Sequence, residues 1–312
     1  MNRLNEIFGA MPLTLKTKFE KIPQPERDKM LEIRLRTGKP VSLTYPQGVR
    51  FLLNDGRVSP LPTEESVTVS KWELSECFKL ACGCSVYSHQ EEIKNGFITM
   101  KNGHRIGLAG TAVQEKGKIS GIRDVSSLNI RIAREVEGAS LPIIYRLWST
   151  GRPRGALIAG APLSGKTTIL RDLARQFSKG ILGPPLRVCV VDERGEIAAV
   201  ASGVSGNELG PSCDILDNYP KSEGILMALR CLSPDVIICD ELGGGEEVQA
   251  VIAGLNAGVP IISSLHASSV KELRMRPQSR ALLETGAFTD IILLKGLESP
   301  GTAAGYYKAG EI

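Results

Sequence analysis

Residues 155–178 read GALIAGAPLSGKTTILRDLARQFS, and this stretch decides the fold. A short apolar run, 156–159, ends at a glycine, and apolar residues recur at helical spacing from Ile169 to Phe177. Between them, residues 160–167 read GAPLSGKT and match the P-loop pattern G-x-x-x-x-G-K-[ST] in its strand–loop–helix context. The stretch therefore predicts a nucleotide-binding loop rather than a glycine-rich turn that carries a lysine by chance.

The residue types of this loop suit phosphate binding. Gly160 and Gly165 let the backbone curl so that its N–H groups point at phosphate oxygens, and the following helix N-terminus adds partial positive charge. We expect Lys166 to reach the β- and γ-phosphates and the Thr167 hydroxyl to ligate Mg²⁺. The predicted nucleotide-binding residues are Gly160, Ala161, Pro162, Leu163, Ser164, Gly165, Lys166, Thr167 and Thr168.

The bulk composition is that of an ordinary folded protein. The chain has 312 residues, of which 42% are hydrophobic and 23% charged, and its length suggests two domains. A net charge of +4 permits an anionic partner without demanding one. No signal-peptide pattern opens the chain, and no apolar run approaches the ~20 residues that span a bilayer. With an odd number of cysteines, seven, we expect reduced thiols in a cytoplasmic protein.

Residues 1–145 are predicted to form a smaller α+β domain. The pattern favours mixed helix over 1–36 and a small sheet with turns over 37–62. A helix is expected from about Ser70 to Ala81. Residues 96–113 then resemble a hairpin with Asn102-Gly103 at its turn.

Residues 146–312 alternate strand and helix patterns, which predicts a mostly parallel, doubly wound α/β sheet. After the P-loop, strands are expected at 186–193, 234–241, 259–266 and 289–296, with helices at 221–232, 245–257 and 270–284. The strands are continuously apolar, as in sheets covered on both faces. Ligands of such sheets bind at the carboxyl ends of the strands, and the polar residues of this domain gather at those ends.

Two carboxylates end the strand PDVIICDE (234–241), which is a Walker B arrangement. We assign Asp240 to the metal and Glu241 to the attacking water, because phosphoryl transfer needs in-line positioning and charge neutralisation more than covalent chemistry. The alternative is a strand end that is merely acidic.

Two further strand ends carry candidate catalytic residues. In VVDERGE (190–196), Glu193 belongs to a second acidic box that positions water or metal, or else this segment starts a helix that favours carboxylates. His266, in SSLHASS, is either a hydrogen-bonded structural residue or a group that senses the γ-phosphate and relays a hydrogen bond to Glu241. Both alternatives stay open.

The order of P-loop, acidic box, Walker B strand and strand-end histidine resembles the secretion ATPases of type II, type IV pilus and type IV systems. The sequence is most similar to one branch, the stage III sporulation protein AA family of endospore-forming bacteria. The similarity covers roughly residues 30–295 and is carried by five stretches, 84–110, 121–135, 190–198, 210–243 and 259–269. Gly243-Gly244-Gly245 and Leu163-Ser164 depart from the expected pattern without removing a catalytic group.

This resemblance implies a RecA-like P-loop ATPase domain that binds ATP and Mg²⁺. It implies a cytoplasmic homo-oligomeric ring, a hexamer, that energises a membrane-embedded channel between mother cell and forespore. The residues carried over are Gly160 to Thr168, Glu193, Asp240, Glu241 and His266. In secretion ATPases, arginines of the first domain reach nucleotide at the subunit interface, and the candidates here are Arg105, Arg123, Arg131 and Arg134.

Two other functions compete with a channel ATPase. A nucleic-acid-dependent RecA-like ATPase is disfavoured, because no appended basic module is visible and aromatics make up only 5% of the chain, which leaves few stacking platforms for single strands. A scaffold that binds nucleotide without hydrolysing it is disfavoured by the intact Lys166, Thr167, Asp240 and Glu241.

Overall fold

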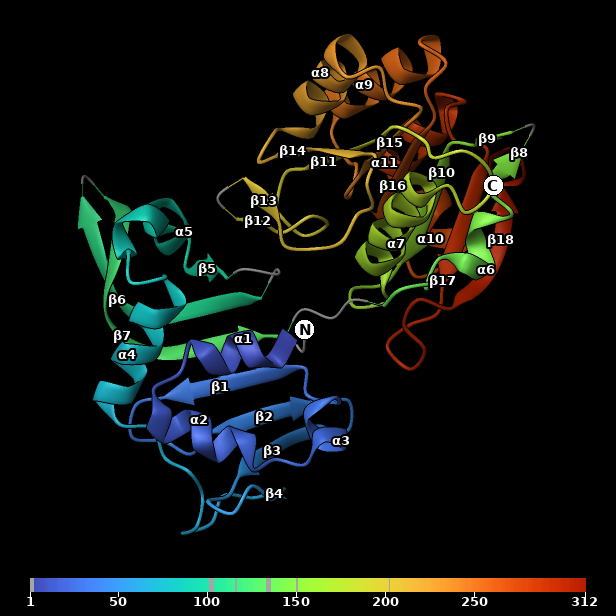
Figure 1. Ribbon diagram of the computed structural model, residues 1–312. Coiled ribbons are helices and arrows are strands. Elements are labelled where there is room, and N and C mark those ends of the chain that lie inside the picture. Colours follow the sequence, from blue (N-terminus) through green and yellow to red (C-terminus); the bar gives the residue numbers. More distant parts are fainter. Residues whose placement is uncertain (1–2, 101–103, 116, 133–135, 150, 202) are drawn as a thin grey trace. The chain divides into compact units, whose positions relative to one another are not determined.

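The computed structural model describes residues 3–100, 104–115, 117–132, 136–149, 151–201 and 203–312 (Figure 1). The chain divides into two compact units, Met1–Arg134 and Glu135–Ile312. The boundary predicted at 145/146 lies inside the second unit, because Ile143, Ile144 and Leu147 pack into that unit's core. As a limit between independently folding domains, that boundary stays a prediction.

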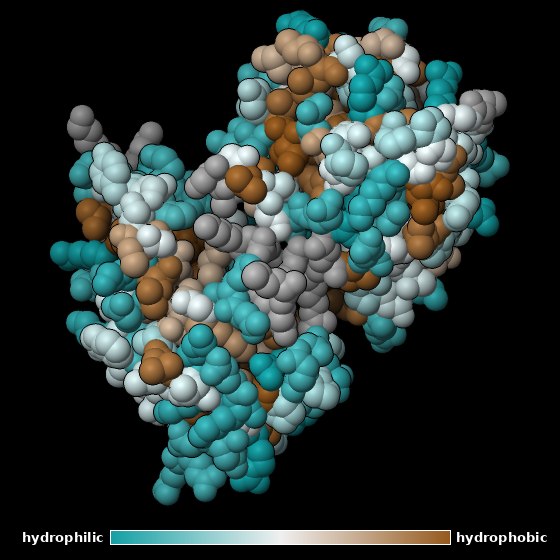
Figure 2. All heavy atoms as spheres, in the orientation of Figure 1, coloured by the Kyte–Doolittle hydropathy of each residue, from teal (hydrophilic) through white to brown (hydrophobic). Residues whose placement is uncertain are grey.

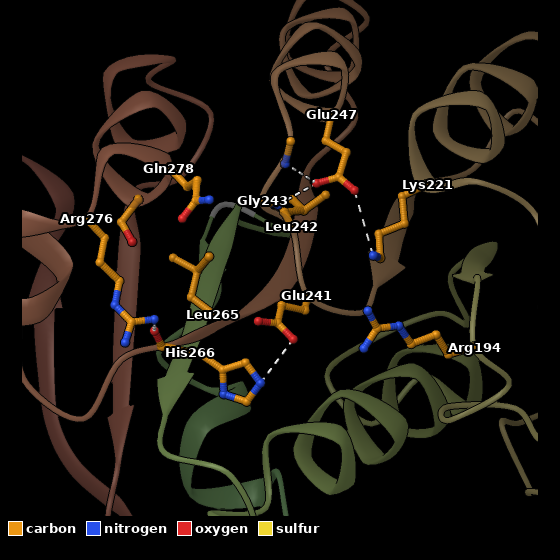
Figure 3. A pocket seen from close by; sticks show the side chains of 12 residues that line it. Arg194, Lys221, Glu241, Leu242, Gly243, Glu247, Leu265, His266, Arg276 and Gln278 are labelled. Atoms are coloured by element: carbon orange, nitrogen blue, oxygen red, sulfur yellow. Dashed lines mark hydrogen bonds and ion pairs between the residues drawn. The ribbon is translucent and has the colours of Figure 1, made fainter. Parts of the chain in front are cut away.

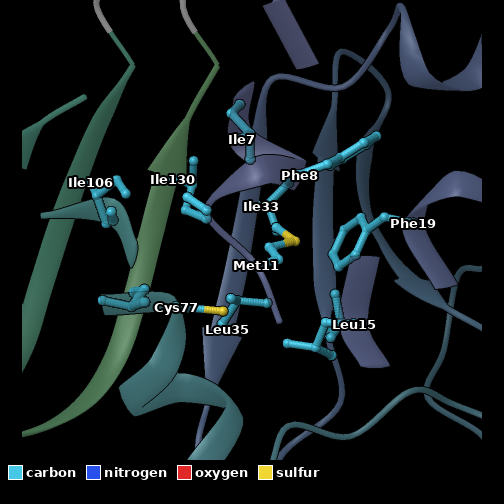
Figure 4. Close-up of a cluster of buried hydrophobic side chains, with 14 of the residues drawn as sticks. Ile7, Phe8, Met11, Leu15, Phe19, Ile33, Leu35, Cys77, Ile106 and Ile130 are labelled. Atoms are coloured by element: carbon cyan, nitrogen blue, oxygen red, sulfur yellow. The ribbon is translucent and has the colours of Figure 1, made fainter. Parts of the chain in front are cut away.

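The first unit is built on an antiparallel sheet of seven strands in the order β4-β3-β2-β1-β7-β6-β5. The helices α1, α2 and α4 pack against it, and Figure 4 shows Ile7, Phe8 and Phe19 of α1 and α2 meeting Ile33 and Leu35 of β1 in its core. The elements of the unit are α1 (Arg3–Gly9), α2 (Leu13–Glu20), α3 (Gln24–Arg27), β1 (Glu32–Arg36), β2 (Ser42–Tyr45), β3 (Gly48–Leu52), β4 (Val58–Ser59), α4 (Lys71–Ala81), the 3₁₀ turn η1 (Val86–His89), α5 (Gln90–Lys94), β5 (Phe97–Thr99), β6 (Arg105–Glu115) and β7 (Lys118–Arg131).

Two expectations for this unit are confirmed and one is wrong. Helix α4 begins after Ser70, whose side chain caps it, and β5 pairs antiparallel with β6 as the predicted hairpin. Its expected turn residues, Asn102 and Gly103, lie outside the described residues. The helix predicted up to residue 36 is wrong at its end, because Glu32–Arg36 alternates charged and apolar side chains with period 2 and forms β1.

The second unit is a doubly wound sheet of seven strands in the order β14-β11-β15-β16-β10-β17-β18, parallel except for β18. The core on one face joins α6 and α7 to the sheet, and the core on the other face joins α8, α9, α10 and α11 to it. The elements are α6 (Leu141–Ile144), β8 (Trp148–Ser149), β9 (Arg152–Pro153), β10 (Ala156–Gly160), α7 (Lys166–Lys179), β11 (Val188–Asp192), β12 (Val200–Ala201), β13 (Val204–Ser205), β14 (Cys213–Asp217), α8 (Lys221–Cys231), β15 (Val236–Cys239), α9 (Gly245–Asn256), β16 (Ile261–His266), α10 (Val270–Met275), α11 (Pro277–Glu284), β17 (Asp290–Leu294), β18 (Ala303–Lys308) and the 3₁₀ turn η3 (Ala309–Glu311).

This architecture is the RecA-like P-loop fold that the alternating pattern and the resemblance imply. The four strands expected after the P-loop are present as β11, β15, β16 and β17. The single helix expected over 270–284 is wrong: it breaks into α10 and α11 at Pro277, which cannot donate a hydrogen bond within a helix but suits a helix start. The edge strand β14 has no counterpart among the predicted elements.

The register of the parallel sheet brings the predicted site residues to one edge. Gly160, the last residue of β10, lies opposite His266, the last residue of β16. Strand β15 runs parallel to β16 and ends at Cys239, directly before Asp240 and Glu241. The P-loop, the two carboxylates and the histidine therefore follow neighbouring strands, as the sheet topology requires.

On the face shown in Figure 2, hydrophobic residues (brown) are interrupted by hydrophilic ones (teal). Within the described part of the chain, every helix is too short or too polar to cross a membrane.

Candidate active site

The P-loop connects β10 to α7 through residues 161–165, and its two glycines have no room for a side chain. A Cβ at Gly160 would lie 2.3 Å from the Ser164 Oγ, and a Cβ at Gly165 would lie 2.5 Å from the backbone nitrogen of Gly301. Gly165 also has φ +93°, the left-handed region that disfavours other residues. The Ser164 hydroxyl is buried and has no hydrogen-bond partner among the residues that the structure describes. The loop thus has the tight backbone curl expected of a phosphate-binding loop, and the Ser164 hydroxyl within it is available to a ligand.

Lys166 opens α7 and turns back onto the loop. Its Nζ donates to the carbonyl oxygens of Gly160 (2.9 Å) and Ala161 (3.1 Å) and lies 3.1 Å from the His266 Nδ1. The amine is buried, and burial lowers its pKa, although the charges of Glu241 and Asp240 oppose that shift. These carboxylates are therefore close enough to the lysine to act on it electrostatically.

His266 joins the P-loop lysine to the Walker B glutamate. Its Nε2 lies 3.0 Å from the Glu241 Oε2 (Figure 3). Because the Lys166 ammonium can only donate, Nδ1 accepts, and the ring proton is then on Nε2, where it is donated to Glu241. The described geometry thus contains the His266–Glu241 hydrogen bond that the sequence analysis left open.

Asp240 is almost fully buried at the carboxyl end of β15. Its Oδ1 accepts a hydrogen bond from the Ser264 hydroxyl (3.2 Å), and its backbone carbonyl accepts one from Ser263 (2.9 Å). Both serines belong to β16. Two strands therefore hold the carboxylate at the edge where α7 carries Thr167.

Two of the three carboxylates in segment 190–196, Asp192 and Glu193, have separate surroundings. Asp192 is fully buried and accepts three backbone N–H groups, from Glu196, Ile197 and Ala198, at 2.7–3.0 Å. Burial raises its pKa to about 6, against the effect of these hydrogen bonds. The alternative of a helix start in this segment is wrong, because residues 193–198 form turns and bends. Asp192 instead ties down this loop.

Glu193 is not part of the group formed by Lys166, His266 and Glu241. Its Oε2 pairs with the Lys221 Nζ at 2.8 Å. The same amine lies 3.7 Å from the Glu247 Oε1, and the other oxygen of Glu247 accepts the backbone N–H groups of Gly243 and Gly244. Sequence reasoning did not single out Lys221 or Glu247; the glycine run that it noted as unusual was the available signal.

A pocket of about 290 Å³ opens beside Glu241 and His266 (Figure 3). Arg194, Lys221 and Glu247 line it from one side, and Arg276 and Gln278 from the other. The Arg276 guanidinium donates to the backbone carbonyl of His266, and so steadies the end of β16. The pocket gives water and solutes access to the Glu241 carboxylate.

The P-loop helix α7 is anchored by its own buried charged side chains. The Asp172 carboxylate accepts hydrogen bonds from the Gly138 and Ser140 N–H groups (3.0 and 2.8 Å), the Ser140 hydroxyl (2.7 Å), Arg175 (3.3 Å) and Gln176 (3.3 Å). Arg171 donates to the carbonyl of Ile197 at 2.9 Å. Helix α7 is thereby fixed to the segment before β8 and to the loop after β11.

The candidate arginines all belong to the first unit. Arg105 stacks over the Phe97 ring at 3.8 Å, Arg131 pairs with Glu32 at 3.6 Å, and Arg123 is exposed beside Asp124. Arg134 lies outside the described residues. A contact between any of them and nucleotide stays a prediction.

Comparison with solved structures supports the fold. The X-ray structure of the Legionella pneumophila ATPase DotB matches with a TM-score of 0.56 and 18% sequence identity, over 91% of this chain and 76% of that one. The crystal structure of the pilus retraction motor PilT with bound ADP matches with a TM-score of 0.51 and 15% identity, over 90% and 76% of the two chains.

Comparison of sequences supports the family. The stage III sporulation protein AA of Bacillus subtilis (strain 168) is 37% identical over 305 residues, which are 97% of this chain and 95% of that protein. The family model described as "Sporulation stage III, protein AA" matches residues 1–312. The chain therefore belongs to the sporulation stage III protein AA family.

Proposed function

We propose that this protein hydrolyses ATP to ADP and phosphate in a Mg²⁺-dependent reaction. The observation that carries the proposal is the chain of contacts from Lys166 through His266 to Glu241, which joins the P-loop to the Walker B strand. A phosphate-binding lysine and a residue that orients the attacking water are two recurring parts of sites that hydrolyse nucleoside triphosphates. The solved ATPase structures that share the fold support the same assignment.

The donor set at the P-loop fits a nucleotide with its magnesium ion. Thr167 supplies a hydroxyl in the first turn of α7. Asp240 supplies a carboxylate that accepts a hydrogen bond from the Ser264 hydroxyl and carries no ion pair of its own in the described residues. Mg²⁺ prefers such oxygen ligands together with phosphate and water. When bound, the ion would neutralise charge on the phosphates.

Each protein group then has a separate role in the proposed hydrolysis. The loop N–H groups and Lys166 bind the phosphates and offset the charge that spreads over the γ-phosphoryl oxygens. Glu241 accepts a hydrogen bond from the attacking water, and His266 holds that carboxylate in place. Water adds to the γ-phosphorus as the bond to the β–γ bridging oxygen breaks, and ADP leaves.

Steady-state ATP hydrolysis by the purified protein tests the proposal, with Lys166→Ala as the blank and with single-stranded nucleic acid present or absent. We expect turnover that needs Mg²⁺, is lost in Lys166→Ala and is indifferent to nucleic acid. Strong stimulation by nucleic acid would favour a nucleic-acid-dependent ATPase instead. Nucleotide binding without turnover in either condition would favour a non-hydrolysing scaffold.

We further propose that the protein assembles into a homo-oligomeric ring, a hexamer, on the mother-cell side of the forespore membrane. There it would power or assemble a channel together with membrane-embedded subunits. Membership of the sporulation stage III protein AA family supports the setting, and the fold shared with a pilus retraction motor supports the mechanical role. Light scattering of the purified protein with and without ATP tests the ring, since a strictly monomeric protein in both conditions would contradict it.

A further inference from the structure

The turn that follows Glu241 has little packing of its own. Residues 243–245 are glycines. A Cβ placed on Gly243 would meet nothing within 4 Å, and one on Gly244 would meet only the Glu247 side chain. Glycine is also the residue with most conformational freedom to lose. A turn of this composition needs an external constraint to hold the glutamate before it in one place.

Glu247 supplies that constraint. Its Oε2 accepts the N–H groups of Gly243 and of Gly244, the latter at 2.8 Å, and so caps the start of α9. Upstream, the Leu242 N–H donates to the Ser264 carbonyl at 3.3 Å, and its side chain is buried. The backbone that carries Glu241 is therefore held from β16 on one side and by the Glu247 carboxylate on the other.

Lys221 in turn fixes the Glu247 carboxylate. Its amine is buried at the start of α8 and lies 3.7 Å from Glu247 (Figure 3). The same amine lies 2.8 Å from Glu193. Burial alone would lower the pKa of Lys221, but the hydrogen bond to Glu193 and the charges of Glu247 and Glu193 outweigh it and raise that pKa. The amine therefore stays charged at neutral pH and joins the loop after β11 to the start of α9.

We propose that Lys221 and Glu247 are positioning residues for Glu241, and that Glu193 acts through Lys221 rather than on the substrate. The proposal rests on the proposed ATP hydrolysis and gives the acidic box of this chain a specific role. A carboxylate that orients water has to be held to a fraction of an ångström, since a misplacement of ~1 Å can cost about a hundredfold in rate. Nucleotide binding, which depends on the P-loop, does not pass through these residues.

Matched substitutions test the idea. Glu247→Gln keeps the size of the side chain and an oxygen for the glycine N–H groups, but removes the charge that faces Lys221. Lys221→Met removes the amine and keeps an unbranched apolar stem. Glu246→Gln, on the exposed neighbouring residue of α9, is the control for a lost negative charge. Steady-state kinetics give kcat and the KM for ATP, and urea unfolding shows whether each variant is folded.

We expect kcat to fall about tenfold to a hundredfold in Glu247→Gln and in Lys221→Met, with KM for ATP almost unchanged. The double variant should be no slower than the slower single variant, because the two residues act as one unit. The kcat of Glu193→Gln should fall less, because Lys221 then still pairs with Glu247. Glu246→Gln should match the wild-type protein.

Four results would overturn the proposal. If kcat in the two variants matches Glu246→Gln while the wild-type protein is active, this inference fails and the ATPase assignment stands. A rise in KM with unchanged kcat would place the network in nucleotide binding, and fully additive losses in the double variant would show two separate structural effects. Absence of wild-type turnover would remove the ATPase proposal together with this one.

Discussion

Replacing Asp172 by alanine should severely destabilise the second unit, because five hydrogen bonds converge on this one buried carboxylate. Two of the donors are the backbone N–H groups of Gly138 and Ser140, which would lose their acceptor. The substitution also removes the anion beside Arg175, whose side chain is 2% exposed. The variant therefore breaks a buried ion pair and leaves buried donors behind, the combination with the largest penalty.

The magnitude follows from these contacts. Removing one partner of a buried, hydrogen-bonded pair costs about 3–5 kcal/mol. With a urea m-value of about 2 kcal/mol/M for a domain of this size, a loss of about 4 kcal/mol lowers the unfolding midpoint by about 2 M. Asp235 offers a matched control, because it pairs with Arg187 on the surface, where solvent screens the interaction. Asp235→Ala should therefore shift the midpoint much less.

Tryptophan fluorescence reports the relevant transition. The chain has two tryptophans, and Trp148 stacks on Phe177 of α7 with ring centroids 6.1 Å apart. In a Trp72→Phe background, the signal therefore follows the packing of α7 in the second unit alone. An Asp172→Ala midpoint shift no larger than that of Asp235→Ala would refute the reasoning, because it would show that the buried network contributes no more than a surface pair.

Three further predictions concern the site. Glu241→Gln should lower ATP turnover by about 10²- to 10⁴-fold while a fluorescent ATP analogue still binds, and unchanged turnover would remove Glu241 from the mechanism. Gly165→Ala should abolish binding of that analogue, because its Cβ would meet the Gly301 nitrogen at 2.5 Å and its φ is +93°; normal binding would show that the loop shifts freely. Burial raises the pKa of Asp192 in the folded protein to about 6, whereas in the unfolded chain this carboxyl loses its proton near pH 4. The stability that this group contributes is therefore lost as the pH rises from about 4 through 6. Across that range, the urea midpoint of unfolding should depend less steeply on pH in Asp192→Asn than in the wild-type protein. An identical dependence on pH would contradict the assignment.

The sequence predicted the features whose signals are contiguous. A P-loop and a Walker B strand each lie within one short segment, and the apolar runs of the second unit could only be buried in a covered sheet. The short strand β1 carries a weak sequence signal, because three of its five residues are charged and only Ile33 and Leu35 are buried. Strand β14, CDILD, is a sheet-edge segment only partly buried, and its sequence carries no comparable apolar signal.

The partners of the site residues could not be predicted in the same way. Lys221, Glu193 and Glu247 come from three separate segments and meet only because β11, β14 and β15 are neighbours in the sheet. Nothing local in KSEGILMALRCL distinguishes a buried lysine at the helix start from a solvated one. The same holds for Asp172 and Arg175, which look like the polar face of an amphipathic helix and are instead almost fully buried.

The hydrogen bonds that Lys166 makes within the protein set a threshold for any ligand. All three protons of its ammonium group have acceptors within the protein, namely two backbone carbonyls and one imidazole nitrogen. A ligand gains from this lysine only if it compensates for the hydrogen bonds that it breaks, and a single small anion offers few oxygens for that purpose. A triphosphate offers oxygens from adjacent phosphoryl groups at once. The loop can thus discriminate against inorganic phosphate by requiring displacement of its own lysine, before any contact with the base or the sugar contributes to selectivity.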